Sequence, residues 1–155
     1  AQKAFDQGYD ANQNQSINED VIQKSISVDA ACSGNPGDME YRGVWTDQGD
    51  ELFHVGPLPN GTNNIGEFLA IVHALALSKQ KQYTYPIYSD SQIAINWVRH
   101  KQARTTIPKD DSTSHIWNLI HRAERWLQTN EYKNKILKWD TKRWGEIKAD
   151  FGRKS

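Results

Sequence analysis

The first clearly patterned segment of the chain, residues 24–31, alternates apolar and small polar side chains, which predicts a β-strand. Two further segments, 39–47 and 51–58, are rich in aromatic and β-branched residues, and the short Gln-Gly-Asp stretch between them predicts a hairpin. Short segments at 85–90 and 135–139 predict two more strands. The pattern therefore predicts five strands, the first three of which are consecutive.

Four other segments, 65–82, 91–101, 112–129 and 144–154, predict helices. The first and third of them carry apolar residues at the three- and four-residue spacing of a helix with one buried face. Residues 102–111 contain a proline and two acids and predict a loop. Strands reached by helical crossovers run parallel, whereas hairpin strands run antiparallel. We therefore predict an α/β fold: a five-stranded mixed sheet with strands 1–3 antiparallel, strands 4 and 5 parallel to strand 1, and flanking helices.

The chain of 155 residues has the length of one domain. Its first 20 residues are rich in Gln, Asn and Asp and hold no helical or strand period. We predict that residues 1–23 form a polar linker or arm and that residues 24–155 form one folded domain. An arm that folds onto the domain or onto a partner is the alternative.

Composition excludes several classes of protein. Lys plus Arg and Asp plus Glu number 19 each, so the chain is not basic overall, although residues 131–155 carry eight basic against four acidic residues. This end of the chain is either a phosphate-facing region or a solvated terminal segment. The single cysteine, Cys32, excludes a disulfide framework and a cysteine zinc cluster. No apolar run approaches the ~18 residues of a spanning helix, and no signal peptide is recognisable, so we expect a cytoplasmic protein without a membrane partner.

Four acidic residues stand where the predicted elements converge. Asp29 lies inside the first strand, Glu67 in the first turn of an apolar helix, Asp90 at the carboxyl end of the fourth strand, and Asp150 in the last helix. Ligand sites of such sheets gather at the carboxyl ends of the strands. Each acid alone also has an ordinary structural explanation: an ion pair, a preference for a helix N-terminus, a helix cap or a surface charge.

Taken together, the four carboxylates predict a cation site. Clustered acids repel and raise one another's pKa unless a cation neutralises them. A site made only of oxygen atoms selects hard cations such as Mg²⁺ or Mn²⁺. Two such ions about 4 Å apart can support hydrolysis of a phosphodiester.

Four segments together resemble the motifs of ribonuclease H type 1, in the order in which that family carries them. They are VDAACSGNPG (28–37), TNNIGEFLAI (62–71), YSDSQ (88–92) and WGEIKADFGRK (144–154). The likeness is greatest to the Bacillus-type branch, whose full-length members carry an N-terminal hybrid-binding domain on a linker. It implies that 24–155 are a catalytic domain with the ribonuclease H-like fold, that 1–23 end such a linker, and that a hybrid-binding domain precedes residue 1 in the natural chain.

The resemblance implies an endoribonuclease that hydrolyses the RNA strand of RNA–DNA hybrids, leaving 5′-phosphate and 3′-hydroxyl ends without strong sequence preference. It implies two Mg²⁺ ions per site, with Mn²⁺ able to substitute. Asp29 would bind both ions, Asp90 and Asp150 would complete opposite sides, and Glu67 would bind one ion and touch a 2′-hydroxyl. Glu146 stands in place of a histidine that many family members carry, and would assist metal exchange and product departure.

Helix geometry places Glu146 and Asp150, four residues apart, on one face of the predicted last helix. An ordinary surface charge is the alternative for Glu146.

The resemblance also implies which residues bind the hybrid. We expect the protein to bind it as a monomer. The set facing the minor groove and its 2′-hydroxyls comprises Cys32, Ser33, Gly34, Asn35, Asn63, Asn64 and Gln92. The set facing the DNA strand comprises Thr62, Asn64, Thr105 and Thr106 at a phosphate, Trp97 at a sugar, and Thr141 as a further phosphate contact. Turn formation is the alternative for Asn63 and Asn64, and core packing for Trp97.

Two other functions remain open from the sequence. A nuclease of related fold that acts on DNA would share the carboxylates but not the specificity for a hybrid. A non-catalytic hybrid-binding module would bind without cleaving, which the presence of all four acids disfavours.

Overall fold

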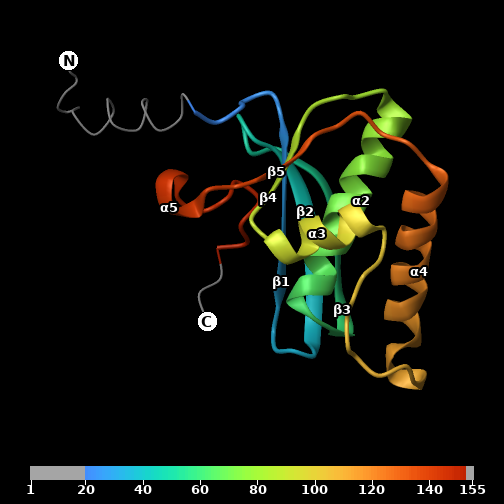
Figure 1. The fold of residues 1–155 in the computed structure, drawn as a ribbon. Helices are drawn as coiled ribbons and strands as arrows, with labels where there is room; N and C mark the ends of the chain where they lie inside the picture. The colour runs from blue at the N-terminus through green and yellow to red at the C-terminus, as the bar shows by residue number, and fades with distance from the viewer. Residues whose placement is uncertain (1–19, 153–155) are drawn as a thin grey trace, which may run out of the picture.

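The structure, a computed structural model, describes residues 20–152. Its five strands form one mixed sheet in the order β3-β2-β1-β4-β5 (Figure 1). β1, β2 and β3 pair antiparallel, β4 pairs parallel to β1, and β5 parallel to β4. The strands are β1 Ile26–Cys32, β2 Gly37–Trp45, β3 Glu51–Gly61, β4 Ile87–Ser89 and β5 Ile136–Lys138. The predicted fold class and strand directions are confirmed.

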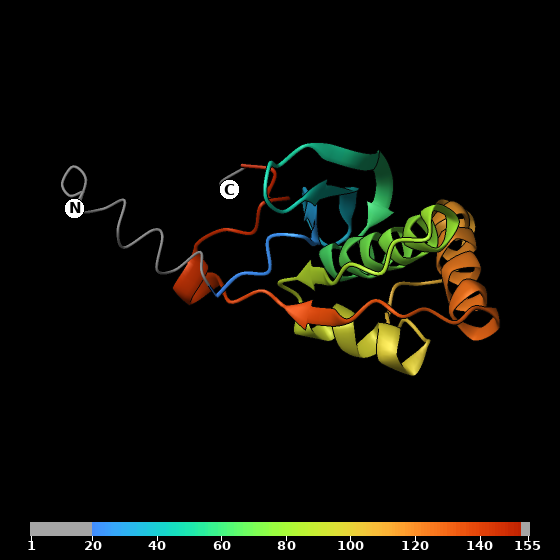
Figure 2. The ribbon, with the colours of Figure 1, turned by 90° about the horizontal axis from the view of Figure 1, so that it is seen from above.

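The helices of the described residues, apart from the short α5, cover one face of this sheet, and α2 lies between the sheet and α4 (Figure 2). They are α2 Asn63–Lys81, α3 Gln92–His100, a 3₁₀ turn at Asp111–Thr113, α4 Ser114–Thr129 and a short α5 Thr141–Trp144. The first three predicted helices are confirmed within a few residues at each end. None of the helices in residues 20–152 has the length and apolar character needed to cross a bilayer.

Local sequence sets the ends of α2 and α3. The Thr62 hydroxyl accepts a hydrogen bond from the Ile65 amide at 3.2 Å, and the Ser91 hydroxyl accepts one from the Ala94 amide at 3.1 Å. Each bond satisfies a backbone donor that has no partner inside the helix. At the other ends, Gln82 and Lys101 adopt left-handed conformations with φ of 62° and 59°. The two N-terminal caps fix the backbone at the start of each helix, where two of the candidate site segments lie.

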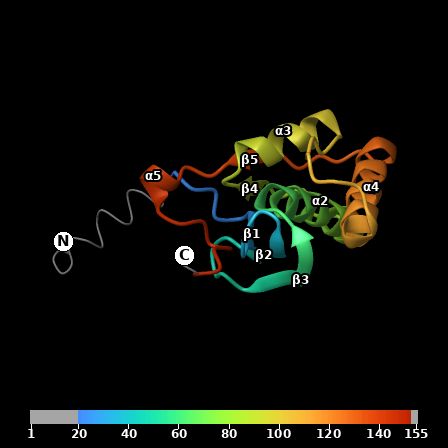
Figure 3. The same cartoon turned by 90° about the horizontal axis from the view of Figure 1, so that it is seen from below.

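The main hydrophobic core forms between α2 and the sheet. β1 directs Val28 and Ala30 toward α2, so the alternation along the strand directs Asp29 to the opposite face. A second cluster occupies that opposite face and comprises Val21, Tyr88, Trp139 and Ile147. The C-terminal segment runs along the same face, across β1 and β2 from α2 (Figure 3). One sheet thus separates the helical core from a smaller core that adjoins the acidic residues.

The N-terminal part of the predicted linker, residues 1–19, lies outside the described residues. Residues 20–23 contact the domain. Val21 is buried in the second cluster, and Asp20 forms an ion pair with Arg143.

The predicted helix at 144–154 is wrong. The short helix α5 ends at Trp144, Gly145 caps it with φ of +80°, and the residues from 145 to 152 form no further helix. Ile147 and Ala149 are buried, and the carbonyls of Ala149 and Asp150 accept hydrogen bonds from Arg42 on β2. Tertiary contacts therefore replace the helical hydrogen bonds of this segment. Glu146 and Asp150 consequently do not share a helix face.

Replacement of Gly66 by alanine tests how closely α2 packs on β1. Alanine in a helix is favoured over glycine by about 1 kcal/mol. A Cβ at Gly66 would however lie 2.8 Å from the Ala30 Cβ and 3.1 Å from the Met39 Cγ. Overpacking of this kind costs about 1–3 kcal/mol, so we expect Gly66→Ala to lower the free energy of unfolding in urea.

Gln80→Ala on the exposed part of the same helix is the control, and should change the free energy of unfolding by less than ~0.5 kcal/mol. If Gly66→Ala were the more stable protein, helix propensity would dominate and the close contact would be of no consequence.

Candidate active site

Asp29 lies at the centre of β1 with only 5% of its surface exposed. Strand pairing between β1 and β4 is recorded only at Ile26–Ile87 and Ser27–Tyr88, so β4 does not cover β1 beyond Ser27. Glu67, Asp90 and Asp150 are the acids around Asp29. Burial, and then the charges of Asp90 and Asp150, raise the pKa of Asp29 to about 6, although a hydrogen bond with Glu67 opposes them. No ion pair in residues 20–152 involves Asp29, so the ion-pair explanation does not hold.

Glu67 is 2% exposed and lies in the second turn of α2, because the helix begins at Asn63 rather than at the predicted Ile65. Burial raises its pKa well above the usual range, and the charge of Asp29 raises it further. The Glu67 Oε1 atom is buried and has no hydrogen-bond partner. A buried polar atom without a partner costs about 1–3 kcal/mol. A preference for the helix N-terminus does not explain a carboxylate placed in this way.

Asp90 follows β4 directly and is half-buried. Ser91 rather than Asp90 caps α3, so the Asp90 carboxylate is not needed for the cap. Burial raises the pKa of Asp90, the charge of Lys138 lowers it, and the charges of Glu146 and Asp150 raise it. Lys138 belongs to β5 and pairs in register with Ser89, which explains how a cation comes to lie beside Asp90.

Asp150 and Glu146 lie near the other acids although neither belongs to a helix. Asp150 is half-buried, and its charge acts on both Asp29 and Asp90. Its Oδ2 accepts a hydrogen bond from the Gly152 amide at 2.9 Å. Glu146 is exposed, and its charge acts on Asp90. Asp150 therefore lies near Asp29 and Asp90, and Glu146 lies near Asp90, although the predicted shared helix face was wrong.

The carboxylates fit a divalent metal ion. Asp29, Glu67 and Asp90 each offer an oxygen, and these atoms lie within 4.8 Å of one another. Their raised pKa values and the unpaired Glu67 oxygen show that, within residues 20–152, the fold brings these carboxyl groups together with too little compensating positive charge, although Lys138 lies beside Asp90. Carboxylate oxygens are the ligands that hard divalent cations prefer. The arrangement is that of a divalent metal site.

A cavity of about 550 Å³ collects a large share of the predicted hybrid-binding residues. It lies between the turn that precedes β2, the start of α2, and the loop that follows α3. The predicted residues that line it are Asn35, Thr62, Asn63, Asn64, Trp97, Thr105 and Thr106. Trp97 is 9% exposed and also packs edge-on against Phe68, so it serves both the core and the cavity wall.

The other predicted substrate residues lie outside this cavity. Cys32 ends β1, and its thiol donates a hydrogen bond to the Gly34 carbonyl at 2.7 Å, which supports the turn. Ser33 accepts a bond from the Asp38 amide at 3.2 Å in the same turn. Gln92 begins α3 beside Asp90, and Thr141 begins α5.

Polar residues that the sequence did not single out complete the cavity wall. Arg104, Asn60 and Ser112 line it together with the predicted residues, and Arg104 adds a positive charge. The Asn60 side chain donates a hydrogen bond to the Ser112 carbonyl at 2.8 Å, which joins β3 to the 3₁₀ turn. The motif at 62–71 covers only the neighbouring start of α2. No sequence signal therefore pointed to Asn60, Arg104 or Ser112 as cavity residues.

Comparison with known proteins agrees with this site. The profile of the RNase H family matches residues 22–148. The chain belongs to the RNase H family. The matched range includes Asp29, Glu67 and Asp90 but ends before Asp150.

Individual relatives support the same family. Ribonuclease H of Acetivibrio thermocellus is 29% identical over 135 residues, which cover 76% of this chain and 91% of the relative. Ribonuclease H of Thermoanaerobacter sp. strain X514 is 31% identical over 130 residues, covering 80% of this chain and 78% of the relative. The crystal structure of RNase H1 from the archaeon Halobacterium salinarum matches with a TM-score of 0.51 at 19% identity, covering 81% and 91% of the two chains. That structure shows the same fold.

Burial of Asp29 makes the stability of the metal-free RNase H depend on pH. The folded Asp29 carboxyl holds its proton up to about pH 6, whereas the unfolded one loses it near 3.8. Its contribution to stability is therefore fully present below about pH 4 and is lost as the pH rises through 6. In EDTA at about pH 7.5, we expect Asp29→Asn to be more stable than the wild type by about 1–3 kcal/mol in urea unfolding.

The two proteins should converge near pH 4, because both then carry a neutral side chain at position 29. Glu131→Gln, which neutralises an exposed acid, should follow the wild-type curve at every pH. An Asp29→Asn variant that is less stable than the wild type at about pH 7.5 would show that the charge of Asp29 is compensated inside the protein.

Proposed function

We propose that this chain is a metal-dependent endoribonuclease that hydrolyses the RNA strand of RNA–DNA hybrids, leaving 5′-phosphate and 3′-hydroxyl ends. The observation that carries the proposal is the buried set of Asp29, Glu67 and Asp90, with oxygens within 4.8 Å, in a chain of the RNase H family. Asp150 beside this set supplies a fourth carboxylate. Four carboxylates provide enough oxygen ligands for two Mg²⁺ ions, and Mn²⁺ takes the same ligands.

Each acid has a place in the proposed mechanism. Bound divalent cations would activate the attacking water and stabilise the leaving oxygen. Asp29 is the acid nearest the middle, since Glu67, Asp90 and Asp150 all act on it, and it would contact both cations. Glu67 would hold one cation with its unpaired oxygen. Asp90 and Asp150 would complete the ligands of the cations on opposite sides of the site.

Glu146 is exposed at the rim of the site. A carboxylate there attracts cations from solvent and accepts them as products leave, which supports a role in metal exchange. Lys138 beside Asp90 places a positive charge where the phosphate backbone would approach.

Recognition of a hybrid requires one set of contacts for each strand. The turn containing Cys32, Ser33 and Gly34 adjoins Asp29, and its backbone groups can reach 2′-hydroxyls, which mark RNA. Asn63, Asn64 and Gln92 would bind in the minor groove next to it. The Asn35 carboxamide accepts a hydrogen bond from the Asn63 amide at 3.1 Å, so this turn and the start of α2 hold a fixed relative position.

The cavity next to Asn35 suits the DNA strand. Hydroxyls of Thr62, Thr105 and Thr106 and the Asn64 amide are donors for a phosphate, and Arg104 adds charge. Trp97 presents an apolar wall against which a deoxyribose packs and a 2′-hydroxyl would be crowded. Thr141 would bind a further phosphate. Contacts to phosphate and sugar carry little sequence information, so we expect weak sequence preference.

The motifs favour the Bacillus-type branch of the family, and Glu146 in place of a histidine supports it. On this basis 24–155 are the catalytic domain, 1–23 are a linker whose end Val21 anchors on the domain, and a hybrid-binding domain precedes residue 1 in the natural chain. One chain supplies all four carboxylates, so the proposed activity needs no second copy, and we propose that the enzyme acts as a monomer. We propose that it acts in the cytoplasm.

Four labelled substrates, RNA–DNA, RNA–RNA, DNA–DNA and single-stranded RNA, test the activity and its specificity together. We expect cleavage of only the RNA of the hybrid in Mg²⁺ or Mn²⁺, none in EDTA, and a rate that falls as salt rises. Cleavage of duplex DNA would assign the chain to a DNA nuclease of related fold. Binding without cleavage would assign it to a hybrid-binding module.

Asp90→Asn tests the metal assignment in the same assay. Loss of an outer partner of a metal ligand costs about 10–100-fold in activity, so loss of a ligand should cost more than ~100-fold. Hybrid binding in a mobility-shift assay should persist. Asp47→Asn, at an exposed turn remote from the acidic cluster, is the matched control and should retain wild-type turnover. Full turnover of Asp90→Asn would contradict the assignment.

A further inference from the structure

Asp150 is the one proposed metal ligand whose backbone neither lies in nor directly adjoins a helix or strand. Asp29 lies on β1, Glu67 on α2, and Asp90 directly between β4 and α3. The residues around Asp150 form only a turn, closed by a hydrogen bond from the Asp150 amide to the Ile147 carbonyl at 2.9 Å. Another part of the fold therefore has to fix the position of this carboxylate relative to the other three.

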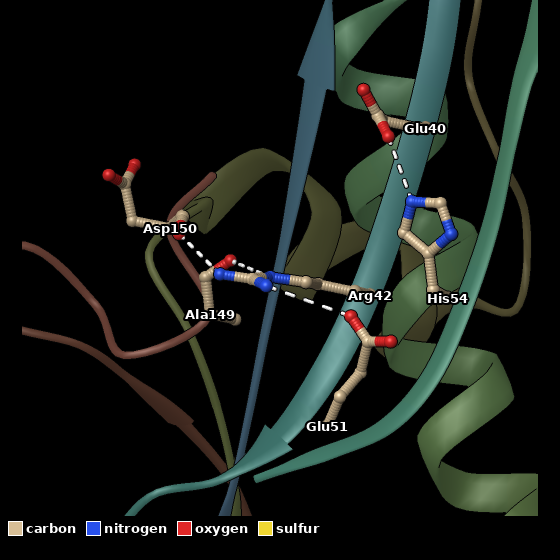
Figure 4. A network of polar contacts seen from close by, with 6 residues as sticks. All are labelled: Glu40, Arg42, Glu51, His54, Ala149 and Asp150. Carbon is tan, nitrogen blue, oxygen red and sulfur yellow. Dashed lines mark hydrogen bonds and ion pairs between the residues drawn. The ribbon is translucent and has the colours of Figure 1, made fainter. Parts of the chain in front are cut away.

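The Arg42 side chain makes that connection (Figure 4). Its Nε donates a hydrogen bond to the Ala149 carbonyl at 2.8 Å, and its Nη2 donates one to the Asp150 carbonyl at 2.5 Å. The two donors lie on one edge of the planar guanidinium and engage two consecutive carbonyls. This bidentate contact fixes both the position and the direction of the backbone that carries the Asp150 side chain.

Arg42 is itself held by rigid parts of the protein. It lies on β2 and pairs in register with Asp29 on β1, so both side chains leave the same face of the sheet. Its Nη1 also lies 3.6 Å from the Glu51 carboxylate on β3, a partly exposed ion pair that contributes little to its position. The guanidinium carbon also lies 4.9 Å from the centre of the Phe151 ring, so the residue after Asp150 packs against the same side chain.

We propose that Arg42 is a positioning residue that ties Asp150 to the central sheet and so completes the metal site. It acts through the backbone of residues 149–150, not through its charge, and it touches neither the substrate nor the metal. The proposal deepens the proposed function and rests on Asp150 being a metal ligand.

The choice of arginine follows from the geometry. A lysine ammonium is a single donor centre on a flexible stem and cannot match two consecutive carbonyls with a fixed fork. Arg42→Lys keeps the positive charge but loses the bidentate contact. Glu51→Gln removes the ion pair and leaves both carbonyl bonds in place, so it is a matched control.

Three measurements on Arg42→Ala, Arg42→Lys and Glu51→Gln separate positioning from a general loss of structure. They are hydrogen exchange of the amides of residues 147–152, calorimetric binding of Mn²⁺ without substrate, and hybrid cleavage as a function of Mg²⁺. In Arg42→Ala we expect exchange at least ~10-fold faster and Mn²⁺ affinity and kcat lower by about 10–100-fold. KM for the hybrid should stay within about 2-fold. Arg42→Lys should show most of the same defects, because it loses the bidentate contact, and Glu51→Gln should match the wild type.

Wild-type exchange, Mn²⁺ affinity and Mg²⁺ dependence in Arg42→Ala would overturn the proposal. If Arg42→Ala fails to fold, as thermal melting would show, Arg42→Lys decides by the same three measurements. Asp150→Asn separates the two levels of the argument. An inactive Asp150→Asn with an unaffected Arg42→Ala contradicts the positioning role and leaves the proposed function standing, whereas an active Asp150→Asn contradicts the ligand role on which both rest.

Discussion

Repulsion between buried carboxylates is the constraint on which the rest of this structure depends. Asp29 and Glu67 are almost fully buried and share a hydrogen bond, and Asp90 and Asp150 add negative charge beside them. Left ionised, these groups oppose folding, because each loses hydration and repels its neighbours. A cluster of this kind persists only where the surrounding fold is stable enough to hold it. The unpaired oxygen of Glu67 shows that the cost is not offset by protein donors alone.

The fold meets this constraint with two cores on either side of one sheet. α2 packs closely on β1, with room at Gly66 for no side chain, which places Glu67 at the level of Asp29. β4 ends where β1 continues, so Asp90 stands beside the same space. The second core, with Trp139 and Ile147, brings the C-terminal segment across the opposite face. The four acids thus come from four segments that are far apart in the sequence, and each segment is anchored separately.

Sequence patterns predicted the strands, the three long helices and the convergence of the acids, because all of these follow from local periodicity and strand direction. The last segment could not be predicted in the same way. Residues 144–154 carry no local signal that their carbonyls would bond to Arg42, more than 100 residues earlier. The cap of α3 is a second example: the sequence left Asp90 open as a helix cap, and the structure shows that Ser91 is the cap instead. The charge of residues 131–155 pointed to the segment that holds Lys138, but its place beside Asp90 follows from the pairing of β5 with β4, and Arg104 reaches the cavity through a loop that no motif marks.

Proton release on metal binding tests the central claim most directly, because it measures whether the fold holds these carboxyls protonated until a cation neutralises them. Calorimetric titration of Mn²⁺ at about pH 6.5, in two buffers with different enthalpies of ionisation, gives the number of protons released per protein. The account predicts release of about one proton, supplied by Asp29 and Glu67. Binding with the same heat in both buffers would mean that no proton leaves, and that the acidic cluster is already ionised and compensated before the metal arrives.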